Sequence, residues 1–493
     1  MKTATLKILD EVNAKFSGLD PSLRTKLFQS QEYMIPQAFH MPAYKLGRWN
    51  GKISFFSQGG STYFHLLEEL LPIITDAGYA LDIDDRREQY DFSFPEVHKN
   101  ILSDLGVVWR EGHELAGQPI VLRDYQVNII KNLLEDLQGV QVAATGAGKT
   151  IVTATLSKLV EQYGKSIVIV PNKGLVKQTE KDYRAVGLDV GVYYGDRKEF
   201  GHQHTICTWQ TLDRIEKEGK KLPPEERPIN YFIDGVICVI CDEVHQAKAQ
   251  VLKTLLTGPF AGIPIRWGLT GTMPKEEHDA KSIRSSIGPI RGELHAYELQ
   301  DKGVLSSCEV AIMQMMESKQ FKNHSEEKDF LLKDKERLHW IAEFSKITAE
   351  SGNTLILVDR ISAGEQLQEN IPGSVFIYGG VKVEEREDHY AEISSENSKI
   401  IIATYGVAAV GIDVPRIFNL VLIEPGKSFV RVIQSIGRGI RKAKDKNHVN
   451  IYDICATTKY SKQHLTERKK YYKESKYPFK VTKIDWRSNI RGL

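Results

Sequence analysis

The segment AATGAGKT, residues 143–150, holds the residue types that bind a nucleotide phosphate. Gly146 and Gly148 allow backbone amides to curl round phosphate oxygens, and a helix beginning there adds partial positive charge. Lys149 reaches the β- and γ-phosphates, and the Thr150 hydroxyl reaches Mg²⁺. The preceding strand-like run and the following helical pattern are the context that such a loop requires. We therefore expect ATP and Mg²⁺ to bind here, through Ala143 (glycine in the general pattern), Thr145, Gly146, Ala147, Gly148, Lys149 and Thr150.

Two adjacent acids end a later apolar run. VICVICDE, residues 236–243, reads as a buried strand that finishes in Asp242 and Glu243. We expect Asp242 to hold Mg²⁺ through water and Glu243 to polarise the attacking water. Such a pair can also be a simple strand-ending turn. Its combination with the glycine-rich loop favours the catalytic interpretation.

Two arginines stand three positions apart in QSIGRGIR, residues 434–441. On a helix this spacing puts Arg438 and Arg441 nearly on one face, as a solvated surface or an anion clamp. The predicted nucleotide site supplies an anion, the γ-phosphate, held by another domain. Arginines that reach it only on domain closure would add about 10³-fold or more in rate and tie hydrolysis to movement. This arrangement is typical of a motor.

Two series of short Val/Ile-rich runs predict the fold class. Apolar strands that alternate with helices form parallel sheets covered on both faces, so we expect an α/β protein with two such domains. The first series comprises 139–144, 166–171, 204–209, 236–243 and 266–272, and the second comprises 354–358, 374–379, 399–404, 420–424 and 450–454. We place the domains at 116–300 and 346–456, with a charged linker or helical connection at 301–345.

The two ends of the chain lie outside the two series of apolar strands. Residues 1–115 predict a small α+β accessory domain, in which Asn50-Gly51 is a strong hairpin-turn signal. Residues around that turn (Lys45, Arg48, Trp49, Lys52) contact a nucleic acid, or the turn is a structural hairpin with solvated cations. Residues 457–493 form a basic tail with several tyrosines and Trp486. This tail tracks phosphates and stacks on bases, or it is a solvated, partly helical terminus.

Length and composition define the class of protein. The chain has 493 residues, 41% hydrophobic and 26% charged, which is typical of a soluble globular protein with several domains. Neither a membrane-spanning apolar run nor a signal peptide is predicted. Five cysteines, few and odd in number, indicate a reducing, cytoplasmic setting. Cys238 and Cys241 form a CxxC without a second ligand pair, so buried thiols are expected rather than zinc ligands.

In their order along residues 121–441, these motifs resemble those of superfamily 2 helicases. The resemblance implies two tandem RecA-like domains. It identifies LRDYQ as the adenine-recognition motif, with Arg123 and Gln126, and GLTGT as the motif that couples hydrolysis to domain movement. IIATYGVAAVGIDVP places Gly411 and Asp413 near the ATP ribose and the nucleic-acid backbone. QSIGRGIR adds Gln434 to the catalytic arginines.

The resemblance also implies nucleic-acid contacts from the strand-tracking motifs. IVIVPNKGLVKQ, TWQTL and TLILVDR carry most of them. The candidate residues are Pro171, Asn172, Lys177, Gln178, Thr208, Gln210, Arg360, Gly379 and Thr404. Lys177 and Thr208 contact backbone phosphates or are structural, and we expect Trp209 in the core.

Three residues near the acids have an open role. His245 is a plain strand-end histidine or a coupling residue that is hydrogen-bonded toward Gln434. Thr270 and Thr272 cap a turn or couple hydrolysis to movement. We favour coupling for all three, on the resemblance.

Within the superfamily, the chain resembles the phage UvsW-type helicases. The stretch YKLGRWNGKI, the TWQT, YGV and IGR segments and the basic tail carry this likeness. It implies an ATP-dependent DNA helicase that unwinds or branch-migrates forked and junction DNA in replication, recombination and repair, with RNA–DNA hybrids as a further substrate. Residues 242–245 read DEVH where DEAD-box helicases have DEAD. This difference argues against a helicase that acts on RNA alone. Alternatives are a double-strand DNA translocase, an RNA or RNA–DNA helicase, and a scaffold with a vestigial ATPase. We expect a monomer without membrane contact, in the cytoplasm of a host cell if a phage encodes the chain.

Overall fold

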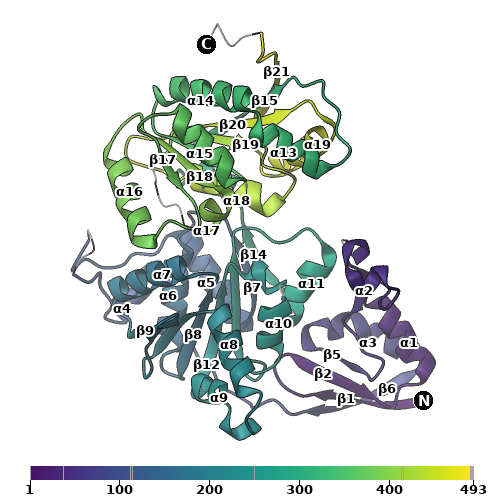
Figure 1. Ribbon diagram of the computed structural model, residues 1–493. Coiled ribbons are helices and arrows are strands. Elements are labelled where there is room, and N and C mark those ends of the chain that lie inside the picture. Colours follow the sequence, from purple (N-terminus) through teal and green to yellow (C-terminus); the bar gives the residue numbers. More distant parts are fainter. Residues whose placement is uncertain are drawn as a thin grey trace. The chain divides into compact units, whose positions relative to one another are not determined.

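The computed structural model describes residues 2–36, 38–111, 113, 115–248, 250–411, 414 and 416–488. The chain divides into two compact units: Met1–Val142 with Lys149–Glu293, and Ala143–Gly148 with Leu294–Leu493. The first unit contains an N-terminal α+β domain and the first RecA-like domain (Figure 1). The second unit contains the second RecA-like domain. No helix among the described residues is long and apolar enough to cross a membrane.

The N-terminal domain packs two helices against a four-stranded sheet, which agrees with the α+β prediction. The strand order is β5-β2-β1-β6, and the core includes Leu6, Phe16, Leu27, Phe56 and Leu70. The strands are β1 (Lys2–Ile8), β2 (Asn13–Ser17), β5 (Ser61–Tyr63) and β6 (Tyr79–Asp85), and the helices are α1 (Pro21–Ser30) and α3 (Leu67–Asp76).

The predicted hairpin turn at Asn50-Gly51 is wrong in its details. β3 (Glu32–Met34) and β4 (Lys52–Ser54) do pair antiparallel, but residues 35–51 separate them, including the short helix α2 (Pro42–Lys45). Asn50 Oδ1 accepts a hydrogen bond of 3.0 Å from the Lys52 amide, and Gly51 has a φ of 81°. A Cβ at Gly51 would lie 2.9 Å from Ala38 Cβ and Met34 Sδ. The dipeptide therefore closes the end of a long loop, where only glycine fits.

The first RecA-like domain has an eight-stranded sheet in the order β10-β9-β11-β8-β12-β13-β7-β14. The strands from β9 to β7 pair parallel, and β10 joins β9 antiparallel. All five predicted strands are present, as β7 (Gln138–Ala143), β8 (Lys165–Val170), β11 (His204–Thr208), β12 (Val236–Asp242) and β13 (Ile265–Thr270). The sequence analysis did not predict β9 (Val190–Tyr194), β10 (Arg197–Lys198) and β14 (Ile290–Leu294).

Helices connect these strands and place the carboxyl ends of the parallel strands at one edge of the sheet, as in other α/β folds. The main ones are α5 (Asp124–Asp136), α6 (Lys149–Val160), α7 (Lys173–Val186), α8 (Trp209–Gly219), α10 (Gln250–Thr257) and α11 (Glu277–Ser286). All five cysteines of the chain are buried and free. The CxxC of β12 is thus part of the core, as predicted.

The second RecA-like domain has a seven-stranded sheet in the order β17-β18-β16-β19-β20-β15-β21, with every neighbouring pair parallel. The strands are β15 (Ser307–Met315), β16 (Thr354–Val358), β17 (Val375–Ile377), β18 (Ile400–Thr404), β19 (Asn419–Ile423), β20 (His448–Ala456) and β21 (Phe479–Ile484). The helices are α13 (His324–Lys333), α14 (Lys335–Ala349), α15 (Ile361–Asn370), α16 (Val383–Ser395), α17 (Tyr405–Gly411), α18 (Phe429–Gly439) and α19 (Lys459–Glu474).

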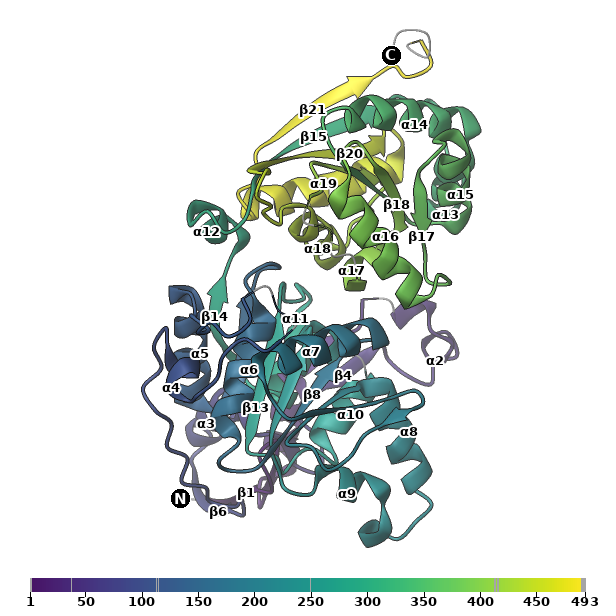
Figure 2. The same ribbon diagram turned by 90° about the vertical axis from the view of Figure 1, so that its left-hand side faces the viewer.

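The predicted linker and tail are both part of this second domain. β15 lies within residues 301–345 and pairs with β20, while β21 lies within residues 457–493 and pairs with β15 (Figure 2). β15 alternates exposed and buried residues at its start, and β21 is mostly exposed, so neither is a continuous apolar run. Strands that are partly exposed, like these two, escape a search for fully buried ones.

Several aromatic residues of the predicted tail lie in the core of the second domain. Tyr472 and Tyr477 are buried, and Trp486 is 1% exposed with its Nε1 donating to the Met316 carbonyl at 3.0 Å. Arg468 forms two hydrogen bonds of 2.8 Å with the buried carboxylate of Asp453. These side chains anchor α19 and β21 to the sheet, so they do not stack on bases.

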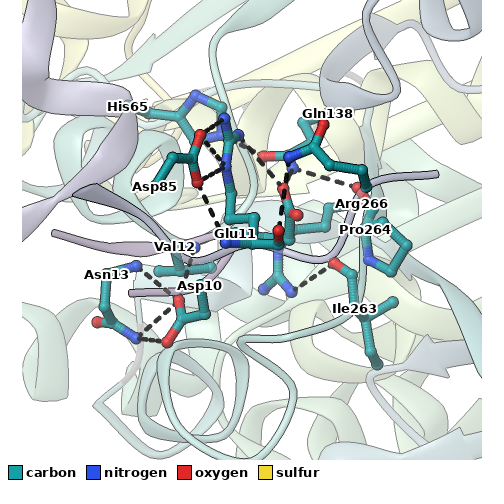
Figure 3. Close-up of polar contacts among 12 residues, drawn as sticks. Asp10, Glu11, Val12, Asn13, His65, Asp85, Gln138, Ile263, Pro264 and Arg266 are labelled. Atoms are coloured by element: carbon teal, nitrogen blue, oxygen red, sulfur yellow. Dashed lines mark hydrogen bonds and ion pairs between the residues drawn. The ribbon is translucent and has the colours of Figure 1, made fainter. Parts of the chain in front are cut away.

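Buried polar contacts join the N-terminal domain to the first RecA-like domain. Gln138, at the start of β7, donates to Glu11 Oε2 at 2.6 Å and lies 2.7 Å from His65 Nε2 (Figure 3). Asn13 donates to the Thr257 carbonyl at 2.9 Å. Burial raises the pKa of Glu11 and lowers that of His65 to about 4. The contact is therefore desolvated and hydrogen-bonded, unlike a flexible tether.

Candidate ATP-binding and coupling site

The predicted phosphate loop has the required backbone geometry. β7 ends at Ala143 and α6 begins at Lys149, so the glycine-rich segment connects a strand to a helix. Gly146 and Gly148 have φ values of 91° and 78°, which L-residues with side chains rarely adopt. The local sequence thus forms a turn whose amides precede a helix amino end, which suits a phosphate.

The two acids and the lysine of this site meet in the first domain. Lys149 Nζ lies 3.8 Å from Glu243 Oε1, and the Glu243 amide donates to Asp242 Oδ1 at 2.9 Å. Glu243 has a left-handed φ of 51°, a strained conformation that is common at functional sites. Burial, and then the neighbouring Glu243, raise the pKa of Asp242 to about 6, while Lys149 acts in the opposite direction. Two carboxylates held close in a desolvated place fit a divalent cation, which would relieve their repulsion.

The three coupling candidates form a buried cluster with Glu243. His245 Nδ1 lies 3.0 Å from Thr270 Oγ1 and 3.3 Å from Glu243 Oε2. The Thr272 amide donates to Thr270 Oγ1 at 3.3 Å, and Thr270 Oγ1 lies 3.5 Å from Glu243 Oε2. His245 is therefore more than a strand-end residue, because it bridges the end of β12 to the end of β13. Its expected contact with Gln434 stays a prediction, since the Gln434 side chain lies outside the described residues.

The predicted adenine motif forms the amino end of α5. The Gln126 side-chain oxygen accepts a hydrogen bond of 2.9 Å from the Arg123 amide, and Gln126 is buried. Arg123 Nη1 donates to the Tyr125 hydroxyl at 2.8 Å. The capping contact fixes the Gln126 side chain beside the helix end. Recognition of adenine by Arg123 and Gln126 stays a prediction.

The candidate nucleic-acid residues of the first domain divide by exposure. Pro171 and Thr208 are buried, and the Pro171 carbonyl accepts a hydrogen bond of 3.1 Å from the exposed Gln210. Asn172 caps α7 by accepting from the Leu175 amide at 3.0 Å. On α7, Lys177 is half-buried and Gln178 is exposed. The ends of β8 and β11 lie side by side, and Gln178 and Gln210 are the candidates with exposed side chains. Contact of these residues with a nucleic acid stays a prediction. Trp209 packs against the core.

The second domain places fewer of the predicted residues in a shared site. Arg360 donates to Asp329 Oδ1, and the Gly379 carbonyl accepts from Arg386 at 3.0 Å. Thr404 ends β18, and Gly411 ends α17. Asp413 and the Arg438 side chain lie outside the described residues. α18 ends at Gly439, so Arg441 lies beyond the helix in a bridge with Leu305. The premise that one helix carries both arginines is therefore wrong.

The sequence analysis missed Arg266, which is fully buried in β13. Its guanidinium donates to the carbonyls of Leu256 and Ser286 at 2.7 Å. Burial lowers its pKa to about 10. The residue ties the strand that ends in Thr270 to the ends of α10 and α11. An arginine inside an apolar strand, IRWGLT, was the available signal.

Comparisons with known proteins cover most of the chain. The family model described as "Type III restriction enzyme, res subunit" matches residues 119–275, and the "Helicase conserved C-terminal domain" matches residues 333–443. The Enterobacteria phage T4 protein named "ATP-dependent DNA helicase uvsW" is 22% identical over 87% of this chain and 86% of that protein. The Sulfurisphaera tokodaii protein named "DNA 3'-5' translocase XPB2" is 26% identical over 42% of each chain.

A solved structure supports the fold. The restriction-modification enzyme LlaBIII bound to DNA aligns with 82% of this chain and 33% of its own, with a TM-score of 0.53 and 13% identity. The predicted motifs, from residues 122–126 to 434–441, all lie within the two ranges that the family models match.

Proposed function

This chain belongs to the superfamily 2 helicases, and we propose that it uses ATP hydrolysis to unwind or branch-migrate forked and junction DNA in replication, recombination and repair. The observation that carries the proposal is the buried cluster of Glu243, His245 and Thr270, which joins the hydrolytic acid to the segment after β13. The T4 relative named as an ATP-dependent DNA helicase supports DNA as the substrate.

In the hydrolytic step, each residue has a distinct role. Lys149 binds the γ-phosphate oxygens, and its 3.8 Å contact with Glu243 is the one that this phosphate replaces. Glu243 orients the attacking water and accepts its proton. Thr150 and Asp242 would hold Mg²⁺, which neutralises phosphate charge when it is bound. The raised pKa of Asp242 fits a carboxylate that becomes stable as an anion beside a cation.

Loss of the γ-phosphate changes the charge that Glu243 faces. His245 and Thr270 contact this carboxylate, so a change at Glu243 passes to the Thr270–Thr272 segment. In this proposal Arg438 and Arg441 stabilise the γ-phosphate in the transition state, as the resemblance implies, and Gln434 joins them. The enzyme works as a monomer in the cytoplasm.

The test is steady-state ATPase activity with no nucleic acid, single-stranded DNA, duplex DNA, a fork, a four-way junction or single-stranded RNA. Each substrate is measured at two salt concentrations, because phosphate contacts are salt-dependent. We expect the fork or junction to stimulate most, and wild-type protein but not Lys149→Ala to unwind the fork. Stimulation by RNA alone would contradict the DNA assignment, and unwinding by Lys149→Ala would contradict the ATP-driven mechanism.

A double-strand DNA translocase that never separates strands is the second candidate. The Sulfurisphaera tokodaii relative that is named as a translocase favours it. Displacement of a third strand from a triplex, without displacement of a strand from a fork, would select this candidate. Fork displacement selects the helicase.

A further inference from the structure

The segment Ala38–Arg48 of the N-terminal domain, called here the exposed loop, presents large apolar side chains to solvent. Leu46 is 64% exposed, Phe39 55% and Met41 45%, and Tyr44 of α2 is exposed as well. Figure 1 shows α2 at the end of the N-terminal domain opposite β1. Several large apolar side chains exposed within one short segment indicate an interaction site.

The charge around the exposed loop indicates the partner. The sequence has no Asp or Glu between Glu32 and Glu68, whereas Lys45 and Arg48 lie within the loop. Neither of these two side chains forms an ion pair with any residue that the structure describes. Aromatic and apolar groups interleaved with cations suit stacked bases flanked by phosphates.

Hydrogen bonds within the exposed loop and between the residues that flank it hold it in place. The Ile35 amide donates to the Gly51 carbonyl at 2.8 Å, which closes the base of the loop, and the Arg48 amide donates to the Ala43 carbonyl at 2.9 Å. Trp49 Nε1 donates to the Lys52 carbonyl at 2.7 Å. The apolar side chains therefore sit on an ordered support, which lowers the entropic cost of binding.

The base of the loop contacts helices that follow the ATP-site motifs. The Tyr33 hydroxyl, on β3, accepts a hydrogen bond of 3.0 Å from Lys281 of α11. Lys253 of α10 lies 4.3 Å from the ring centre of Phe55 and 5.0 Å from that of Tyr63. α10 follows the acids of β12, and α11 follows Thr270 and Thr272. The strands that flank the exposed loop, rather than the loop itself, are thus attached to the first RecA-like domain.

We propose that the exposed loop is a wedge that inserts Phe39 and Leu46 between base pairs at the branch point of forked DNA, while Lys45 and Arg48 contact the flanking phosphates. Apolar side chains inserted at a base step unstack it and bend the duplex. A branch point is already partly unstacked, so insertion there costs less than in continuous duplex. The proposal rests on the proposed function and names the element that recognises the branch.

The test compares the double variant Phe39→Ala/Leu46→Ala with the control Phe200→Ala. Phe200 is 63% exposed on the first RecA-like domain and, like Phe39, contacts one aromatic neighbour. Fluorescence anisotropy measures binding to a fork and to an unbranched duplex of equal length, alongside fork unwinding and ATPase activity with single-stranded DNA. We expect fork preference and fork unwinding to fall about tenfold in the double variant, since stacking on one base has roughly this effect. Its ATPase activity on single-stranded DNA, and all activities of the control, should be unchanged.

Unchanged fork preference in the double variant overturns the wedge, as does an equal loss in Phe200→Ala. A change in sedimentation without a change in fork binding assigns the surface to a contact between copies of the chain and also overturns it. As a second measurement, p-benzoylphenylalanine at position 39 should crosslink to nucleotides beside the branch, and crosslinks spread evenly along the fork contradict the proposal. If wild-type protein binds forks through this loop but does not unwind them, the proposed helicase function fails while the wedge remains.

Discussion

Two glutamates in equivalent places of the two RecA-like sheets have opposite surroundings. Glu243 follows β12 with a φ of 51°, and Glu424 follows β19 with a φ of 42°. Glu424 accepts hydrogen bonds of 2.8 Å from Arg337 and from Ser461. Glu243 instead lies 3.8 Å from Lys149, a distance that leaves room for exchange of partners.

The difference shows that the same backbone position serves two purposes. In the second domain, the carboxylate is saturated by fixed donors and holds α14 and α19 against the sheet. In the first domain, the carboxylate lies near Lys149, His245 and Thr270, all of them groups of the proposed ATP cycle. The strained turn after a central strand therefore presents an acid, and the surrounding donors decide its role.

The largest expected effect is loss of hydrolysis in Glu243→Gln. The amide cannot accept a proton from water, so ATPase turnover should fall by about 10²–10⁴-fold. ATP binding, followed with a fluorescent nucleotide, should remain. Turnover within a few-fold of wild type would show that Glu243 resembles Glu424 in function.

For Glu424→Gln we expect a loss of stability rather than of chemistry. The substitution leaves the buried Arg337 guanidinium without its charge partner, which costs about 3–5 kcal/mol when one member of a buried pair is removed. Denaturant unfolding measures this loss. ATPase activity of the folded fraction should match wild type, and a catalytic defect without destabilisation would break the comparison.

Asp242→Asn should stabilise the nucleotide-free protein at pH 8 while abolishing its ATPase activity. Because the folded pKa of Asp242, about 6, exceeds its ordinary value of 3.8, the wild type loses stability as pH rises from about 4 to 6. Above pH 6 the variant should be more stable by roughly 1–3 kcal/mol.

The two proteins should unfold nearly alike at a pH well below 3.8, where the side chain at position 242 is neutral in both the folded and the unfolded chain. Thermal melts of both proteins across this pH range, without nucleotide or Mg²⁺, measure the difference in stability. A stability difference that does not depend on pH would exclude titration of Asp242 as its cause.

The smallest effect is expected for Thr270→Val, which keeps the shape of the side chain but removes its hydroxyl. His245 and the Thr272 amide then lose a buried partner, so coupling should weaken while Glu243 still acts on water. We expect DNA-stimulated ATPase activity within about threefold of wild type, and fork unwinding per ATP reduced about tenfold. Ser282→Ala, a change in a buried serine of α11, is the control. Equal losses in ATPase activity and unwinding would assign Thr270 to catalysis instead.

The sequence alone determined the parts of this protein that depend on short-range order. The glycines of residues 143–150 favour a tight turn before a helix, and the continuous apolar run 236–242 favours a strand inside a parallel sheet. These local constraints placed the phosphate loop, the two acids and ten core strands in the correct order.

Tertiary structure decided the features that depend on distant partners. Glu424 becomes structural because Arg337, 87 residues earlier, reaches it. β21 becomes a strand because it pairs with β15. Gln138 can be buried because Glu11 and His65 of the N-terminal domain form hydrogen bonds with its side-chain amide. In each case the residue type permits more than one environment, and the hydrogen-bond partner that selects among them lies far away along the chain.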